Sequence, residues 1–412
     1  MRVLLLNQAF YPDVAATAQH AHDLALDLVE RGHEVTVVAS RAIYGSKGAD
    51  LPRREVVDGI EVRRVGGSLF GKGGTLARLV DFLLFYVLAT WAVVRLPRQD
   101  VVVPFTTPPL IVVGAVVAGW LKGHRTVYWV MDLYPEVAEA HGMMKPGGAM
   151  AGVLRGVSRW ACRRCAAVVA LGRCMKRRLI EHGVNESKIE IIRVWADKQE
   201  LSPLAAEANG LRAEWGLEGQ FVVMYSGNFG LAHEADTIIA AIDALYEEEG
   251  LRFVFVGSGK ALAKLRDHVA ERGMERVRIE GYQPRERLSE SLNVGDVHLI
   301  AQTDAMTGLI VPSKLFGVLA VGRPAVFVGP SESEVGRVIE EAGAGRVVKC
   351  GDTDGLVAAL RELKADVAGA AAMGAKGRAA FEAQYDRRIA TGRWAEVLEG
   401  VAGAGKAEKL EN

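Results

Sequence analysis

Short apolar runs alternate with helix-like segments along most of the chain. In the first half a helix over about 17–31 ends before Gly32, a residue type favoured just after a helix C-terminus. The strand-like runs in this half are 3–7, 33–40, 60–65, 101–105, 126–131, 166–171 and 189–194. Runs of this kind are typical of parallel strands covered on both faces. The pattern predicts an α/β fold with a doubly wound parallel sheet.

The alternation stops at 199–219 and then restarts. The later strand-like runs are 221–228, 251–257, 276–282, 296–301, 324–329 and 345–350. The 412 residues exceed the size of a usual single core. We therefore predict two Rossmann-like doubly wound domains that face a central cleft. The expected division is an N-terminal domain (1–198), a linker (199–219), a C-terminal domain (220–384) and a helix (385–412) that crosses back to the first domain.

Two apolar stretches in the first half raise the question of a membrane span. The first, 82–94, has 13 residues, and the second, 101–121, is interrupted by Pro104, Pro108 and Pro109. A spanning helix needs about 20 continuous apolar residues. We expect a buried or interfacial helix over 82–94, followed by a strand, a proline turn and a core helix.

Charge and cysteine content exclude several classes of protein. Lys+Arg and Asp+Glu both number 50, so the chain lacks the overall positive charge of a nucleic-acid-binding protein. Four cysteines form no disulfide framework, and Cys162 and Cys165 have metal-like spacing but no second pair. We therefore interpret Cys162 and Cys165 as small residues on one face of a helix. The histidines give no clear set of metal ligands.

A basic stretch stands out against this balance. Residues 140–180 contain nine Lys or Arg and no Asp or Glu. Such a stretch attracts anionic lipid headgroups or a lipid pyrophosphate, and the alternative is a solvated basic helix face. The residues we single out for a membrane patch are Arg155, Arg159, Arg163 and Arg164.

Two glycine-containing segments follow strands in the second half. YSGNFG (225–230) and VGSG (256–259) leave strands and open helices, and Lys260 follows the second segment. Free N–H groups at such positions suit a phosphate, although ordinary strand-to-helix turns also use Gly and Asn. Neither segment has the Walker pattern, so ATPase chemistry is disfavoured.

Two further residues are candidates for chemistry. Lys314, in the first turn of a short helix, opposes the helix dipole, which makes sense if an anion binds there. Asp132 directly follows a strand, where a carboxylate can act as a base or accept a hydrogen bond from a sugar hydroxyl. The alternative for Lys314 is an ordinary surface lysine, and the alternative for Asp132 is a helix cap.

These segments, in this order, resemble glycosyltransferase family 4, the retaining nucleotide-sugar enzymes of GT-B fold. The first half contributes RGHEVTV (31–37), TPP (107–109) and DLYPE (132–136). The second half contributes YSGNFG, VGSG and VPSKLFGVLAVGRP (311–324). The last group is similar to enzymes that make colanic acid, O-antigen and capsule. The resemblance covers nearly the whole chain.

The resemblance implies a bacterial hexosyltransferase-type enzyme of surface polysaccharide or lipopolysaccharide biosynthesis. It would move a sugar from a nucleoside-diphosphate sugar to a glycan acceptor, expected to be lipid-linked. It would act without metal or cofactor, in the cytoplasm, peripherally on the inner face of the plasma membrane. The implied catalytic residue is Asp132. Implied donor-binding residues are Gly227, Asn228, His233, Gly257, Lys260, Tyr282, Gly308, Leu309, Ile310, Lys314 and Glu334. Implied acceptor-side residues are Ala15, Ala16, Thr17 and Thr107.

The chain departs from the family pattern at functional positions. Two glutamates common in the family are replaced by Leu309 and Gly317, counted back from Gly322. An arginine and a lysine of the first phosphate loop are replaced by Asn228 and His233. The usual Gly-Gly is Ala15-Ala16, and a histidine often found before the aspartate is Met131. Candidate substitutes are Lys314, Lys260, Asp304 and Glu334, and we expect a donor site specific to a subgroup.

Two other functions remain open at this point. A nucleotide-sugar epimerase of the same architecture needs no lipid acceptor, which would leave the basic stretch unexplained. A non-catalytic nucleotide-sugar-binding protein is favoured slightly by the missing glutamates.

Overall fold

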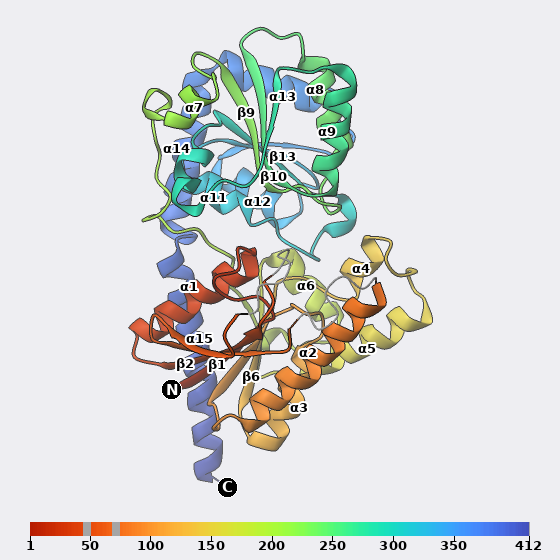
Figure 1. Cartoon of the computed structure of the whole chain (residues 1–412), viewed down its shortest axis with the longest axis vertical. Coiled ribbons are helices and arrows are strands. Elements are labelled where there is room, and N and C mark those ends of the chain that lie inside the picture. Colours follow the sequence, from red (N-terminus) through yellow and green to blue (C-terminus); the bar gives the residue numbers. More distant parts are fainter. Residues whose placement is uncertain (44–50, 68–74, 412) are drawn as a thin grey trace. The chain divides into compact units, whose positions relative to one another are not determined.

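The computed structural model describes residues 1–43, 51–67 and 75–411. The chain forms two compact units (Figure 1). Unit 1 comprises Met1–Arg193 together with Arg388–Asn412, and unit 2 comprises Val194–Arg387.

Unit 1 is built on a sheet whose described strands run in the order β3-β4-β2-β1-β5-β6-β7-β8. Its strands are β1 (Arg2–Leu6), β2 (Glu34–Ser40), β3 (Arg54–Val57), β4 (Ile60–Val65), β5 (Val101–Pro104), β6 (Arg125–Val130), β7 (Ala167–Ala170) and β8 (Ile189–Ile191). All neighbouring pairs are parallel except β3 and β4. The apolar runs of the sequence became these parallel strands because both faces of the sheet are covered by helices.

The helices of unit 1 are α1 (Ala16–Glu30), α2 (Thr75–Arg95), α3 (Val112–Lys122), α4 (Glu136–Ala140), α5 (Ala149–Arg164), α6 (Arg173–Glu181) and α15 (Arg387–Glu411). The α15 helix, which follows unit 2 in the sequence, supplies a central part of the unit 1 core. Its Trp394 is fully buried, and its ring lies 4.6 Å from the ring of Trp129 in β6. Over the described residues, no helix combines the length and apolar character needed to cross a membrane.

Unit 2 contains a fully parallel sheet in the order β11-β10-β9-β12-β13-β14. Its strands are β9 (Phe221–Asn228), β10 (Leu251–Ser258), β11 (Val277–Glu280), β12 (Val297–Ala301), β13 (Ala325–Val328) and β14 (Gly345–Val348). The strand order reverses beside β9, in the doubly wound arrangement that the sequence predicts. Proteins with doubly wound sheets bind ligands beyond the carboxyl ends of the strands, at the point where the strand order reverses. We therefore expect ligand sites at these positions in both units.

The helices of unit 2 are α7 (Gly210–Glu214), α8 (Asp236–Leu245), α9 (Lys260–Arg272), α10 (Leu288–Leu292), α11 (Lys314–Ala320), α12 (Glu334–Ala342), α13 (Thr353–Ala365) and α14 (Val367–Gln384). They enclose an apolar core to which the strands contribute Val223, Phe253, Phe255, Leu299 and Val326.

Residues 199–219 form part of unit 2, which corrects the predicted linker. Leu211 and Trp215 are buried in a cluster with Val222 and Val254. Arg212, also buried, donates to both carboxylate oxygens of Asp296 at 3.1 Å. The short α7 helix has too few turns to show an amphipathic pattern, which is why the sequence suggested a linker.

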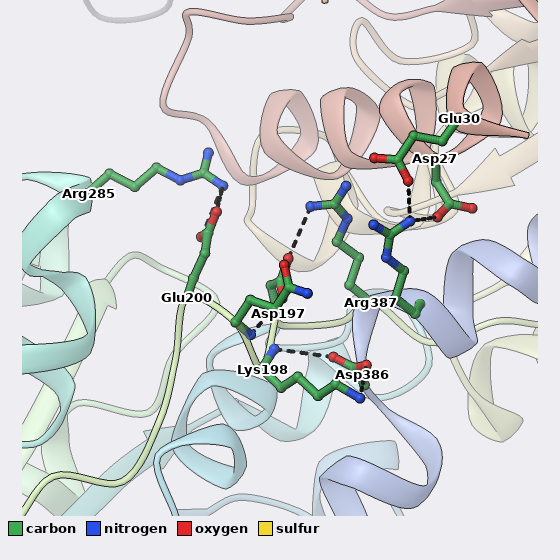
Figure 2. Close-up of polar contacts among 10 residues, drawn as sticks. Asp27, Glu30, Asp197, Lys198, Glu200, Arg285, Asp386 and Arg387 are labelled. Atoms are coloured by element: carbon green, nitrogen blue, oxygen red, sulfur yellow. Dashed lines mark hydrogen bonds and ion pairs between the residues drawn. The ribbon is translucent and has the colours of Figure 1, made fainter.

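The chain crosses between the units twice, and polar contacts within each unit hold the residues near these crossings (Figure 2). In unit 2, Arg387 N–H donates to Ala196 O at 2.9 Å, and Asp386 accepts from the N–H of Lys198 at 3.2 Å. Arg387 also contacts Asp197 at 3.0 Å. In unit 1, the next residue, Arg388, donates to Asp27 of α1 at 2.7 Å.

Candidate functional site

Three glycines lie where β9 and β10 of unit 2 end. Gly227 and Gly257 are paired in the parallel register, and Gly259 directly precedes α9. A Cβ on Gly257 would lie 2.2 Å from the carbonyl oxygen of Gly227. All three have φ between 116° and 136°, a region that residues with side chains rarely adopt. Only glycine allows the two strand ends to approach each other in this conformation.

Lys314, the first residue of α11, lies against the end of β9. A Cβ on Gly227 would come within 3.0 Å of Cε of Lys314, so the glycine leaves room for the lysine side chain. Nζ of Lys314 is 3.1 Å from Nε2 of His233 and 5.2 Å from the centre of the Tyr225 ring. Burial lowers the pKa of Lys314 to about 7. These neighbours are not anions, so they do not neutralise the ammonium charge.

His233 links this amino group to the loop after β9. Nδ1 of His233 lies 3.1 Å from the N–H of Gly230 and 3.3 Å from its carbonyl oxygen. A charged Lys314 donates to Nε2, and Nδ1–H then faces the carbonyl of Gly230. A neutral Lys314 accepts from Nε2–H, and Nδ1 then accepts from the N–H of Gly230. The imidazole can therefore match either protonation state of the lysine by changing tautomer.

The turn before α11 carries the three residues predicted to offer N–H groups to a diphosphate. The N–H groups of Leu309 and Ile310 donate to the carbonyl oxygen of Met306, at 3.0 and 3.4 Å. These two amides could contact a phosphate only if the turn opened. Gly308, between Thr307 and Leu309, adopts a φ of 74°. The buried Gln302 braces the turn by donating to Met306 O and Ile310 O.

Sequence reasoning did not single out Gln302. The available signal was a polar residue that directly follows the wholly buried strand β12. Tyr225 was also missed as the ring beneath Lys314, because an aromatic residue inside an apolar strand is usually a packing residue.

The remaining predicted donor residues lie in different surroundings. Tyr282 and Asn228 are exposed, and Ser258 Oγ donates to the hydroxyl of Tyr282 at 3.2 Å. Glu334 begins α12 and is buried. Lys260 is exposed in a groove on the outer faces of α8 and α9, lined also by Asp236, Lys264 and Asp267. Lys260 directly follows Gly259 at the start of α9, and its role in donor binding stays a prediction.

In unit 1, polar residues follow three strands that are adjacent in the sheet. Asn7 follows β1, Thr106 and Thr107 follow β5, and Asp132 follows β6. Within the described part of the chain, Oδ1 of Asn7 and Oγ1 of Thr106 are buried without a hydrogen-bond partner. These two atoms can therefore hydrogen-bond water or a polar ligand at this edge of the sheet. Both residues lie in strand-end loops, but the sequence alone gave them no special role.

Asp132 is the ionisable group among these residues. It is half-buried, and burial raises its pKa to about 6. A carboxyl group with this pKa changes charge just below neutral pH, which suits it to receive a proton or a hydrogen bond from a hydroxyl. The preceding residue, Met131, is buried, and it stands where the family often has histidine.

The predicted acceptor-side residues Ala15, Ala16 and Thr17 form the start of α1. Ala15 is the N-cap, and its side chain makes no capping hydrogen bond. Its N–H instead donates to the buried Asp13 at 2.9 Å. The start of α1 and the polar residues after β1 thus belong to the same loop of unit 1.

The structure corrects the predicted role of Arg155. Its Nε donates to Glu136 at 2.8 Å, and its guanidinium also contacts Glu139. Glu136 lies 3.2 Å from His182 as well. Burial alone would raise the pKa of Glu136, but hydrogen bonds from His182 and Arg155 lower it to about 2. Arg155 therefore ties α5 to α4, and it is not a free cation for a lipid headgroup.

The cysteines and histidines show no arrangement for metal chemistry among the described residues. Cys162 and Cys165 are free and buried, and burial raises the pKa of Cys162 to about 12. No group of three or more His, Cys, Asp or Glu in the described ranges is placed to hold a metal ion. That the reaction needs no metal stays a prediction.

Comparison with known proteins relates both units to one class of enzyme. Residues 16–195 match the glycosyl transferase 4-like domain, and residues 220–366 match the glycosyl transferases group 1 domain. The chain is 25% identical over 374 residues to the putative colanic acid biosynthesis glycosyl transferase WcaI of Escherichia coli K12. That alignment covers 88% of this chain and 92% of the relative.

Solved structures show the same fold. The sucrose-phosphate synthase of Thermosynechococcus elongatus superposes with a TM-score of 0.77 at 14% identity, covering 98% of this chain and all of that one. Anabaena HepE in complex with UDP-glucose superposes with a TM-score of 0.72 at 16% identity, covering 97% of this chain and all of HepE. Together, the two matched domains and the two mainly parallel sheets establish that the chain belongs to the glycosyltransferases of GT-B fold.

Proposed function

We propose that this enzyme transfers a sugar from a nucleoside-diphosphate sugar to a lipid-linked glycan during bacterial surface polysaccharide assembly, with retention of the anomeric configuration. The relative named for colanic acid biosynthesis supports the polysaccharide assignment. HepE, with UDP-glucose bound, shows that a protein of this fold accommodates a nucleotide sugar. We place the reaction in the cytoplasm, peripherally on the inner face of the plasma membrane.

The amino group of the half-buried Lys314 is the observation that carries the donor assignment. It lies at the carboxyl edge of the unit 2 sheet, beside the strand-end glycines and in contact with uncharged rings. A diphosphate would supply the negative charge that its present contacts do not provide, and charge-assisted hydrogen bonds are stronger than neutral ones. Tyr282, exposed near the end of β10, is suited to stack on the base.

The proposed reaction needs positioning and charge stabilisation from the protein. The bond between the sugar anomeric carbon and the diphosphate oxygen breaks, and the acceptor hydroxyl oxygen bonds to that carbon on the same face. The hydroxyl proton passes to the departing diphosphate. Lys314 stabilises the growing negative charge on the diphosphate, and Asp132 accepts a hydrogen bond from the acceptor hydroxyl and orients it.

The donor site is tested by two lysine substitutions that differ in surroundings. Lys314→Ala should weaken binding of the preferred nucleotide sugar about 10- to 100-fold, since a hydrogen bond to a charged group contributes roughly 1.5–3 kcal/mol. Lys260→Ala removes an exposed lysine of the same unit and should leave affinity within about twofold. Calorimetric titration follows a thermal-shift screen of UDP, GDP, dTDP, ADP and CMP sugars. A ligand at 100 times its Kd raises stability by about 2.7 kcal/mol.

Equal affinity in Lys314→Ala and the unchanged enzyme would remove the proposed role of this lysine. Donor binding with conversion of the sugar but no transfer to any acceptor would favour an epimerase instead.

Asp132→Asn tests the acceptor role in unit 1. We expect kcat to fall about 10- to 100-fold, with donor Kd and Tm unchanged, because the neutral amide accepts a weaker hydrogen bond from the acceptor hydroxyl than the carboxylate does. Since burial raises the pKa of Asp132 to about 6, the unchanged enzyme should gain activity as the pH rises through 6. The variant should lack that rise. A pH profile of the same shape in both proteins would assign the titration to another group.

A further inference from the structure

Helix α2 is apolar on two opposite faces. Phe85, Ala89 and Val93 are buried against the sheet. Leu83, Val87 and Trp91, spaced four residues apart on another side, are between 52% and 66% exposed. A helix with apolar residues all round is normally buried on every side, whereas a surface helix has a polar outer face. The outer stripe of α2 therefore has the composition of an interface.

Helix α3 extends this exposed apolar surface. The two helices pack closely at Gly114, where a Cβ would lie 2.2 Å from Oγ1 of Thr90. Val117, Trp120 and Leu121 of α3 are exposed, the last two by 60% and 70%. Leucine and tryptophan at such exposure in one place differ from the single apolar residues scattered over most surfaces.

Helix α5 completes the surface. The ring of Trp160 meets that of Trp120 edge-on at 5.5 Å, which joins α5 to α3. Met150 and Val153 of α5 are exposed on the same helical stripe as Trp160. Figure 1 shows α2, α3 and α5 as neighbours in unit 1, and α3 contacts both of the others. We call this surface the apolar face; its members are Phe82, Leu83, Val87, Trp91, Val117, Trp120, Leu121, Met150, Val153 and Trp160.

Arginine side chains lie beside the apolar face. The guanidinium of Arg95 lies 4.8 Å from the centre of the Trp91 ring, and that of Arg164 lies 5.8 Å from the centre of the Trp120 ring. Arg163 is also exposed at the end of α5. Neither α3 nor α5 contains an acidic residue, and neither do residues 82–95 of α2. The nearby carboxylates of α4, Glu136 and Glu139, are paired with Arg155.

We propose that the apolar face docks onto an anionic phospholipid bilayer, with α2, α3 and α5 lying against its surface. Apolar side chains enter the acyl boundary, the tryptophans sit at the headgroup level, and the arginines contact lipid phosphates. A second copy of this chain fits the charge less well, because a twofold contact would bring the two arginine sets together. The proposal names the membrane partner of the proposed function, yet it depends only on unit 1 surface residues.

Matched valine substitutions test the apolar contact. Val87→Glu places a charge on the apolar face, and Val367→Glu makes the same change at a valine of similar exposure at the start of α14 in unit 2. Binding to vesicles of phosphatidylglycerol and phosphatidylcholine is measured by sedimentation. We expect Val87→Glu to weaken vesicle binding at least tenfold and Val367→Glu to leave it unchanged. Equal binding by both variants would overturn the proposal.

The cationic rim is tested separately. The double variant Arg163→Gln/Arg164→Gln should lose most of its preference for vesicles that contain phosphatidylglycerol over pure phosphatidylcholine. Fluorescence should shift to the blue when the unchanged protein binds vesicles, and less so in Trp120→Phe. Equal binding of the unchanged protein to both vesicle types contradicts the role of the rim.

Two control measurements separate this proposal from others. Calorimetric affinity for the nucleotide sugar should be unchanged in Val87→Glu, so failure of membrane docking is distinguishable from failure of the donor site. Light scattering should give the same mass for Val87→Glu and the unchanged protein. A mass that halves in the variant, without vesicle binding by either, would show that a second copy covers the face.

Discussion

At Lys314, burial and charge act against each other. The surroundings lower the pKa of the amino group to about 7, while its place beside the strand-end glycines suits a charged ligand. The His233 ring accommodates both protonation states, so the site can hold the amine without a ligand and the ammonium with one. The lysine is thus adapted to receive its proton together with the donor.

Donor binding should therefore depend on pH above neutrality. In the free enzyme the amine loses its proton as the pH rises through about 7, and a bound diphosphate restores it, so binding takes up close to one proton at pH 8.5. We expect Kd to increase roughly tenfold from pH 7 to pH 8.5. Titration calorimetry in buffers of different ionisation enthalpy measures the proton uptake.

A Lys314→Arg variant provides the control, because arginine stays charged across this range. Its affinity should change little with pH. A flat profile in the unchanged enzyme would mean that the lysine is already charged without donor.

Sequence reasoning singled out Asp132 because it directly follows a strand, and Lys314 because it lies in the first turn of a short helix. It misjudged Arg155, whose carboxylate partners lie 16 and 19 positions earlier in the sequence and come near only when α4 packs on α5. Which way a side chain turns depends on packing, and a local pattern does not contain that information.

Among secondary-structure elements, the parallel strands were the most predictable. Buried parallel strands need continuous apolar runs, and β9 and β12 fall close to the predicted boundaries. The antiparallel edge strand β3 was missed, because RREVV mixes charged and apolar residues at the exposed edge of the sheet. The α7 segment was assigned to a linker because its stability comes from burial of Leu211 and Trp215 rather than from helical periodicity.

The contact between β9 and β10 gives a prediction at this scale. Gly257→Ala must resolve a 2.2 Å approach to the Gly227 carbonyl at a φ of 136°. We expect it to lower the stability of unit 2 by about 2–4 kcal/mol, as strained backbone and overpacking together do. Thermal unfolding followed by circular dichroism measures the change.

Gly250→Ala is the matched control for this substitution. Gly250 precedes β10, has a φ of 69°, and a Cβ there would meet no atom within 4 Å. It should cost about 1 kcal/mol from backbone conformation alone. Equal losses of stability would show that the strand ends separate easily.

For the whole molecule, the notable feature is that unit 1 is assembled from two separated parts of the chain. Residues from Arg388 onward pack in unit 1, although all of unit 2 lies between them and the first part. Trp394, Ala395 and Leu398 of α15 are buried there. The division into two domains could be predicted from the restart of the strand pattern, but the residues that α15 contacts could not, because nothing in its sequence identifies its partner.

This arrangement sets an order of events on the ribosome. The strands of unit 1 are made first, and Trp129 in β6 lacks its partner Trp394 until the codons for unit 2 have been read. At usual synthesis rates the delay is roughly 10–50 seconds, during which unit 2 can complete its own core. During that interval the apolar surface of unit 1 that α15 will cover is still exposed on the nascent chain. A chaperone that binds exposed apolar surfaces therefore has more time to bind unit 1 than unit 2.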